Sequence, residues 1–295
     1  MPDGLTGRIT LDSPLTDGVY FLHVGPNIKD VAGNTMDQNA DGIGSLDWQD
    51  VYQASFTVDL TPPGAPATVS FADDTGSTGD AVTSDTELVF TWTDATDANG
   101  ISGYEYRIDG GGWTAASGMS ATASLSEGPH VFEVRAVDGA GNIGPAASRN
   151  VMVDLTAPEA PTGLFLDGAV LNWAAAADAN GIWRYEFRVD GGDWTGAAGL
   201  SAPTGLADGA SGELEVRAID KAGNVGPAAT ATLTADYGPR ITDHGPAGVL
   251  HGPVEYIDVT FNEPIDPASF GLDDVSVVLT TPIELGKIGR ASCRE

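Results

Sequence analysis

The chain has 295 residues, with 42 acidic against 13 basic side chains and a formal net charge of -29 at pH 7. Such an acidic surface repels phosphate groups, so nucleic acid is excluded as a partner. No apolar run is long enough to cross a bilayer, and we expect no membrane insertion. The acidity itself fits metal binding, solubility or a saline habitat equally. Its 39 glycines and 18 prolines separate short strand-like runs, which predicts an all-β protein.

An acidic loop is the first feature along the chain. From residue 37 to residue 44, oxygen-bearing side chains occupy alternate positions and glycine stands sixth, as in an acidic calcium loop. The twelfth position is Trp48 where a complete loop has glutamate, so Asp47 or Asp50 would have to substitute. A calcium site and an Asx-rich turn both fit this pattern. The candidate ligands are Asp37, Asn39, Asp41, Ile43 and Asp47.

Two copies of one module follow, over residues 59–154 and 155–236, with most equivalent positions 81 or 82 residues apart. A repeat of this length is a small domain and not a solenoid turn. The recurring motifs are Trp92 and Trp173, Asp97-Ala98-Asn99-Gly100 and Asp178-Ala179-Asn180-Gly181, Tyr104-Glu105-Tyr106-Arg107 and Tyr185-Glu186-Phe187-Arg188, and the turns at residues 138–142 and 220–224.

Alternation within the first copy predicts its strands. Leu88, Phe90 and Trp92 share one face of a strand, and a later strand runs from Asn150 to Asp154. Two central strands turn apolar residues inward, and their outward residues form an exposed ladder of opposite charges if the strands are neighbours. The ladder consists of Glu105, Arg107, Glu133 and Arg135.

These motifs resemble fibronectin type III modules and the related bacterial Ig-like repeats, over about residues 65–235. The resemblance implies tandem Ig-like β-sandwiches in a linear array. The sixth strand of that family carries a tyrosine corner, where this chain has His130 and Gly212. We therefore expect the corner hydrogen bond to be absent and the second copy to be the less stable one.

The flanking segments resemble a surface-layer type of bacterial Ig-like domain cut in two, its C-terminal half at residues 1–58 and its N-terminal half at 237–287. The resemblance implies incomplete sandwich halves at both ends, with exposed strand edges. Residues 288–295 resemble a translated sequencing-library adaptor, and they contain the only cysteine. Cores built from the remaining residues must therefore hold without disulfides.

Acidic residues also mark the proline-containing joints that enter the two modules. The implied sandwich brings the entering linker and two loops together at one end, where calcium bound by their oxygens would stiffen the joint. The alternative is that these sequences are turns without metal. The candidate ligands are Asp59, Asp97, Asn99, Asp138 and Asn142 at the first joint, and Asp154, Asp178, Asn180, Asp220 and Asn224 at the second.

Catalysis is not expected, because the four histidines are scattered and none has a metal-ligand or Ser/His/Asp spacing. Trp113 and Trp194 follow equivalent glycine turns, where they would stack on sugar rings or pack on the sandwich. We expect a non-catalytic spacer of a large bacterial secreted or cell-surface protein, adhesin-like, beside neighbouring domains and a cell-surface or glycan ligand. The alternative is a set of accessory modules in an extracellular carbohydrate-active enzyme.

Overall fold

The computed structural model describes residues 6–40, 42–44, 49–248, 250–271 and 274–276. These residues form strands and loops, with no α-helix among them. None of the described residues belongs to a helix capable of crossing a bilayer. The chain divides into two compact units, residues 1–157 with 220–224, and residues 158–219 with 225–295.

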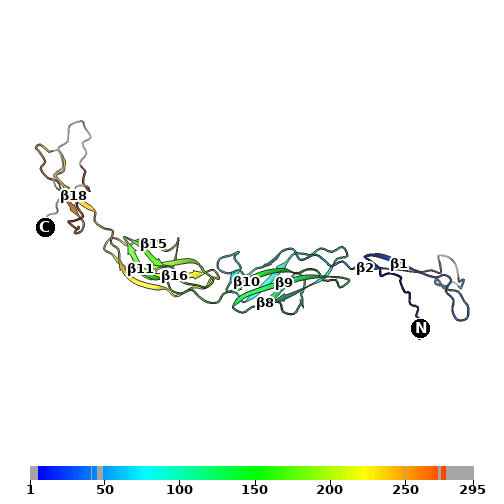
Figure 1. Ribbon diagram of the computed structural model, residues 1–295. Helices are drawn as coiled ribbons and strands as arrows, with labels where there is room; N and C mark the ends of the chain where they lie inside the picture. The colour runs from blue at the N-terminus through cyan, green and yellow to red at the C-terminus, as the bar shows by residue number, and fades with distance from the viewer. Residues whose placement is uncertain (1–5, 41, 45–48, 249, 272–273, 277–295) are drawn as a thin grey trace. The chain divides into compact units, whose positions relative to one another are not determined.

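The first unit contains a complete β-sandwich, whose strands β8, β9 and β10 are labelled in Figure 1. One sheet has the order β3-β5-β8, and its strands are β3 (Val69–Phe71), β5 (Glu87–Trp92) and β8 (Ser120–Ser124). The other has the order β4-β10-β9-β6-β7, and its strands are β4 (Val82–Thr83), β6 (Ile101–Ile108), β7 (Thr114–Ala115), β9 (Gly128–Asp138) and β10 (Ala147–Val153).

The core of this sandwich lies between the two sheets. Every second residue of β5 is buried, from Leu88 to Trp92, because successive side chains of a strand point to opposite faces. Phe132 of β9 is completely buried and stacks on Phe90 of β5, with 4.1 Å between ring centroids. Aromatic residues therefore join the two sheets directly.

The second unit contains the second sandwich, with sheets ordered β11-β12-β15 and β14-β13-β16-β17. Its core is separate and contains Leu171, Trp173, Phe187 and Leu214. The predicted fold class of tandem β-sandwiches is thus confirmed. The strands are β11 (Thr162–Asp167), β12 (Val170–Ala174), β13 (Ile182–Val189), β14 (Thr195–Ala197), β15 (Ser201–Pro203), β16 (Ser211–Asp220) and β17 (Ala229–Thr234).

The predicted charge ladder lies on the outer face of β6 and β9. These strands pair antiparallel, with Glu105 opposite Arg135 and Arg107 opposite Glu133. The Arg107 guanidinium donates two hydrogen bonds to the Glu133 carboxylate, at 2.8 and 2.9 Å. Both ends of β10 differ from the predicted range of Asn150 to Asp154, because β10 begins at Ala147, where its pairing with β9 starts, and ends at Val153.

The expectation of an absent corner hydrogen bond is wrong for the first sandwich. The Nε2 atom of His130 lies 2.8 Å from the carbonyl oxygen of Ser126, four residues upstream. That is the bond a corner tyrosine makes to upstream backbone, here made by an imidazole. Gly212 has no side chain to make it, and Leu206 lies beside it.

The terminal segments each contain one two-stranded antiparallel sheet. The first pairs β1 (Gly18–Val24) with β2 (Tyr52–Val58), and the second pairs β18 (Ile241–Gly245) with β19 (Asp258–Phe261). On the first sheet Tyr20 stacks on Phe56, which is still 46 % exposed. Apolar side chains therefore remain in water in a segment that has no second sheet among the described residues.

In both sandwiches the backbone of the entering linker lies in close contact with a glycine. A Cβ atom on Gly144 would lie 2.5 Å from the carbonyl oxygen of Pro63, and one on Gly226 would lie 2.5 Å from that of Pro158. A distance this short is a clash with backbone, so only glycine allows the linker to run this close to the loop.

Substituting alanine for Phe132 should lower the free energy of unfolding of the first sandwich by about 3–5 kcal/mol, because it removes the stacked ring and leaves a cavity. Chemical denaturation followed by tryptophan fluorescence measures this loss. Phe132→Leu is the matched control, since the equivalent Leu214 is also completely buried, and its loss should be smaller. A loss below about 1 kcal/mol for alanine would contradict the assignment of Phe132 to the centre of the core.

Candidate functional site

Three aspartates of the first unit meet at one end of its sandwich. Asp59 comes from the entering linker, Asp97 from the loop between β5 and β6, and Asp138 from the end of β9. One carboxylate oxygen from each lies within 4.8 Å of the others. Asp138 is 2 % exposed, and one oxygen of Asp59 is buried without a hydrogen-bond partner. The structure therefore assembles an oxygen-rich, acidic cluster from three separate segments.

The two asparagines expected at the same place have positioning roles. The Nδ2 atom of Asn142 donates to the Asp138 carboxylate at 2.8 Å and to the carbonyl oxygen of Asp59 at 3.0 Å. It thereby ties the linker to the turn after β9. Asn99 instead donates its backbone N–H to Asp97 at 2.7 Å, which forms an Asx turn.

Asp138 stays ionised in spite of its burial. Burial raises the pKa of this carboxyl, but hydrogen bonds from Asn142 and from the backbone of residues 140–142 outweigh burial, so its pKa lies below the ordinary value. The backbone N–H groups of Ala140 and Asn142 each donate to Oδ1 at 2.9 Å. The turn thus presents a fixed negative charge beside two further carboxylates.

In the second module, the equivalent residues form part of the same arrangement. Within the first unit, the carboxylates of Asp154 and Asp220 approach within 4.8 Å, and the two residues are 1 % and 0 % exposed. Asn224 donates to Asp220 at 2.9 Å and to the carbonyl oxygen of Asp154 at 2.8 Å. One carboxylate oxygen of Asp154 is buried and accepts no hydrogen bond.

Asp178 and Asn180 belong to the second unit. The carboxylate of Asp178 accepts hydrogen bonds from the backbone of Asn180 and Gly181, both at 2.8 Å. This is the Asx turn that the sequence allowed as an alternative, and Asn180 supplies its backbone N–H to it.

The oxygen ligands of the two aspartate clusters, one at each linker, suit a hard cation. Calcium takes six to eight oxygen ligands from carboxylates, backbone carbonyls and water, at about 2.3–2.6 Å. Asp59, Asp97, Asp138 and Asp154 take part in no ion pair with an arginine or lysine among the described residues. A bound divalent cation would balance the charges and satisfy the buried oxygen of Asp154.

The acidic loop of the N-terminal segment is only partly described, because Asp41 and Asp47 lie outside the described residues. The Asp37 carboxylate accepts a hydrogen bond from the backbone of Gly42 at 2.8 Å. Asn39 and Ile43 are exposed, and the completely buried Asp50 accepts from the backbone of Gln38 at 3.1 Å.

Trp113 and Trp194 lie against arginines of the outer sheet faces. The guanidinium carbons of Arg107 and Arg135 lie 4.5 and 3.9 Å from the centroid of Trp113. Arg188 and Arg217 take the same positions at Trp194, at 4.5 and 4.1 Å. Each ring is half-buried and has two cationic partners, which favours packing over sugar stacking. Packing on the sandwich was one of the two predicted roles of these rings, but their arginine partners were not predicted, although the equivalent spacing of arginine and tryptophan in both repeats is a signal for them.

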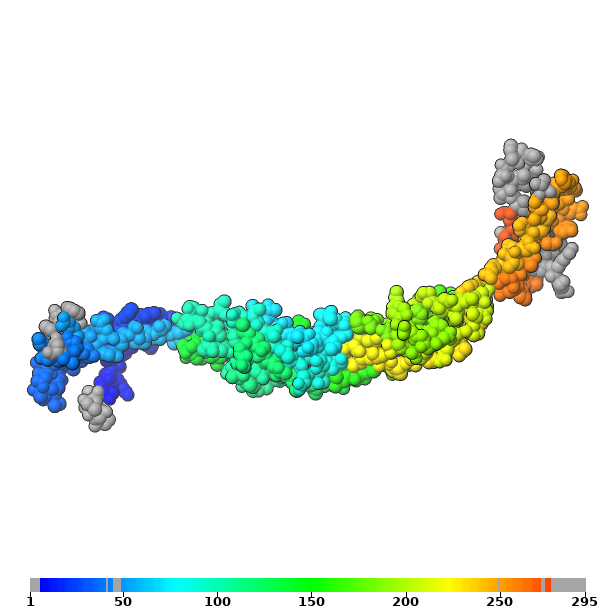
Figure 2. All heavy atoms as spheres, turned by 180° about the vertical axis from the view of Figure 1, so that it is seen from behind, coloured from blue at the N-terminus to red at the C-terminus, as the bar shows by residue number. Residues whose placement is uncertain are grey.

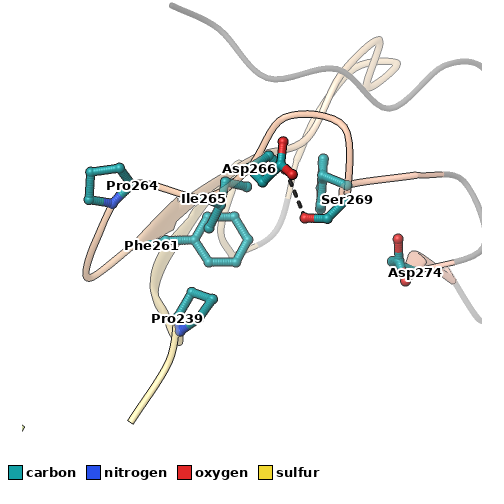
Figure 3. Close-up of a pocket in the computed structure, with 8 residues that line it drawn as sticks. Pro239, Phe261, Pro264, Ile265, Asp266, Ser269 and Asp274 are labelled. Atoms are coloured by element: carbon teal, nitrogen blue, oxygen red, sulfur yellow. Dashed lines mark hydrogen bonds between the residues drawn. The ribbon is translucent and has the colours of Figure 1, made fainter. Parts of the chain in front are cut away.

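A cavity of about 240 Å³ lies in the C-terminal segment, and its lining rings and aliphatic side chains come from Pro239, Phe261, Pro264 and Ile265 (Figure 3). Ser269 caps the loop there by donating to the carbonyl oxygen of Asp266 at 2.8 Å. Small-molecule sites usually enclose about 300–1,000 Å³ with convergent polar groups. On the face shown in Figure 2, the coloured atoms of the two sandwiches show no deep hollow.

Comparisons with known proteins place the chain beside parts of larger enzymes. No protein-family model matches the chain. It is 34% identical to Chitinase A1 of Niallia circulans over 190 residues, which cover 59% of this chain and 26% of the chitinase. It is 30% identical to Exoglucanase B of Cellulomonas fimi over 243 residues, which cover 75% of this chain and 22% of the exoglucanase. The chain thus spans about a quarter of the length of these relatives.

Among solved structures, the fibronectin(III)-like modules of Clostridium thermocellum CbhA align over 57% of this chain and 94% of theirs, at 16% identity and a TM-score of 0.36. The FN1–FN3 domains of chicken CNTN1 align over 63% of this chain and 71% of theirs, at 15% identity and a TM-score of 0.38.

Replacing Trp194 with alanine should lower the stability of the second sandwich by about 1–2 kcal/mol through loss of its two cation–π contacts, and leave retention on insoluble chitin or cellulose unchanged. Urea denaturation and a pull-down measure the two effects. Trp113→Ala is the matched control in the first sandwich. Loss of polysaccharide retention at unchanged stability would show instead that the ring contacts sugar.

Proposed function

We propose that the chain is a pair of non-catalytic accessory modules, with flanking segments, from a longer extracellular carbohydrate-active enzyme. The alignment with Exoglucanase B carries this proposal, because it covers three quarters of this chain but under a quarter of that protein. A stretch shared with a chitinase as well as an exoglucanase is expected to be a part that both kinds of enzyme can use, and not the part that fits one substrate.

The internal structure of the sandwiches supports a spacing role. Each has its own buried core, so each can fold around its own side chains. The histidine of the first sandwich is engaged with Asp109 and Ser126, and the described nucleophilic side chains near it form no triad with it. The linker of each sandwich is fixed by asparagine, since Asn142 and Asn224 both donate to a linker carbonyl oxygen.

The stalk of an adhesin remains the second candidate, and it shares the same domain type. The relatives favour the enzyme-associated alternative, because both are named as enzymes that act on chitin or glucan chains. Under either proposal the modules lie outside the cell, beside neighbouring domains of the same polypeptide, and the flanking segments are halves of further Ig-like domains.

The complete reading frame tests this proposal directly. We expect it to encode a glycoside hydrolase domain, and we expect the present chain to release no sugar from chitin or cellulose. Sequencing on both sides and a reducing-sugar assay provide the two measurements. A reading frame that encodes a cell-wall anchor and no hydrolase would contradict the enzyme proposal and leave the adhesin stalk in its place.

We also propose that calcium binds at the acidic ends of the linkers and stiffens them. The supporting observations are the three meeting carboxylates of Asp59, Asp97 and Asp138, and the buried, unbonded oxygen of Asp154 beside Asp220. A cation there would draw a linker carboxylate onto the turn that follows β9 or β16. The same residues would otherwise repel one another at the point where the chain must be firm.

Asp154→Asn distinguishes a calcium site from a turn without metal. A calcium site predicts that the substitution lowers the melting midpoint in calcium, whereas a turn without metal predicts that it raises the midpoint. With chelator present, removing one of two adjacent buried charges should raise the melting midpoint. With calcium at a hundred times its dissociation constant, the unchanged protein should gain about 2.7 kcal/mol, and the variant should lose most of that gain. Asp193→Asn, an exposed turn residue, is the control. Equal midpoints of the unchanged protein with calcium and with chelator would overturn the calcium proposal.

A further inference from the structure

His130 connects two loops at one end of the first sandwich. Its Nδ1 atom lies 2.7 Å from Oδ2 of Asp109, in the turn between β6 and β7. Its Nε2 atom lies 2.8 Å from the carbonyl oxygen of Ser126, in the loop between β8 and β9. The His130 side chain is only 12% exposed, whereas the Asp109 side chain is 46% exposed.

Both neighbours of the ring accept hydrogen bonds and neither can donate one. A backbone carbonyl has no proton, and the Asp109 carboxylate is ionised, since burial raises its pKa but the bonds from His130 and Val131 lower it further. A neutral imidazole carries a proton on one nitrogen only. Both bonds therefore exist together only when the ring is the doubly protonated imidazolium.

Asp109 is the charged partner of this ring, because the charged groups on the surrounding segments contact other residues. Glu127, beside Ser126, accepts a hydrogen bond from Thr156 at 2.5 Å. On β10 the residue opposite His130 is the apolar Val151, and Arg149 lies over the ring of Phe71 at 5.6 Å. Asp109 is held in place from the other side, because its Oδ1 atom accepts the backbone N–H of Val131 at 2.8 Å.

The second sandwich keeps the turn but lacks the histidine. Asp190 has a φ of 51° and Asp109 one of 50°, and Asp190 accepts the backbone N–H of Glu213 at 2.8 Å, as Asp109 does that of Val131. Gly212 stands at the place of His130, and the side chain of Leu206 lies beside it. One chain thus contains an ionic corner and an apolar corner on the same framework.

We propose that His130 is an acid-closed clasp: its protonated ring holds the β6–β7 turn to the β8–β9 loop, and loss of one proton opens one of the two bonds. A corner tyrosine keeps its proton far into the alkaline range, since its ordinary pKa is about 10, whereas histidine titrates near 6.5. Replacing the phenol by an imidazole therefore makes this corner of the first sandwich, and not that of the second, respond to pH near neutrality.

The direction of the effect follows from the partners. Burial lowers the pKa of His130, but the bonds to Asp109 and Ser126 and the charge of Asp109 raise it more, so its pKa in the folded protein lies above the ordinary value. Stability from the clasp is complete below about pH 6.5 and is lost as pH rises through the higher folded pKa. Protonation of Asp109 opens the clasp again only below about pH 4.

NMR titration of the intact chain in chelator tests the proposal. We expect the imidazole of His130 to titrate above about 6.5, with protons on both nitrogens at pH 6. From pH 6 to 9 the hydrogen-exchange protection factor of the Val131 amide should fall relative to that of the equivalent Glu213 amide. Asp109→Asn should lower the titration midpoint of His130, and His130→Gln should abolish the relative fall at Val131.

A titration midpoint at or below about 6.5 in the unchanged protein would overturn the clasp, and this measurement does not depend on whether a variant folds. An equal pH response of the Val131 and Glu213 amides would also overturn it. Neither result bears on the proposed role in a carbohydrate-active enzyme, because the corner lies outside the acidic linker sites and the enzyme proposal rests on other residues.

Discussion

The two-residue alternation of β6 and β9, and of β13 and β16, is the constraint on which each sandwich depends. One face of these strands fills the core with rings and branched side chains, and the other carries glutamate opposite arginine. A slip of one residue would place the arginines in the core, so the pairing register has a single solution. The register shifts at a bulge between Ile101 and Gly103, and Asp138, opposite Ile101 at the end of β9, belongs to the carboxylate cluster.

Alternation predicted the central strands and the charge ladder, and composition predicted an all-β protein, whereas the tandem-sandwich fold followed from the resemblance to fibronectin type III modules. That resemblance also identified the aspartates that meet at the end of the first sandwich, because a sandwich of this kind brings the entering linker and two loops to the same end. The role of Asn142 could not be predicted, since asparagine offers both a donor and an acceptor, and the folded linker selects the donor. The start of β10 was missed because Ala147 and Ser148 lack the apolar alternation of the rest of the strand.

The histidine corner was missed for a different reason. A family pattern identifies the corner by its tyrosine, so the presence of another residue there led to the prediction that the corner hydrogen bond is absent. The hydrogen bond depends on a donor of suitable reach near the start of β9, and an imidazole satisfies that need. In the second sandwich Leu206 occupies the equivalent space. The two repeats therefore share their central strands while they differ in how one end is closed, which sequence similarity alone does not reveal.

The glycines that face the linkers have a consequence for how such chains can be recombined. At Gly144 and Gly226 the missing side chain is what lets a linker carbonyl lie against the loop that follows β9 or β16. The course of each connector thus depends on a glycine that lies 81 residues downstream of Pro63 in the first module and 68 residues downstream of Pro158 in the second, in the body of the module that the connector enters. Natural shuffling or laboratory grafting of these modules must therefore move the connector together with the domain that follows it.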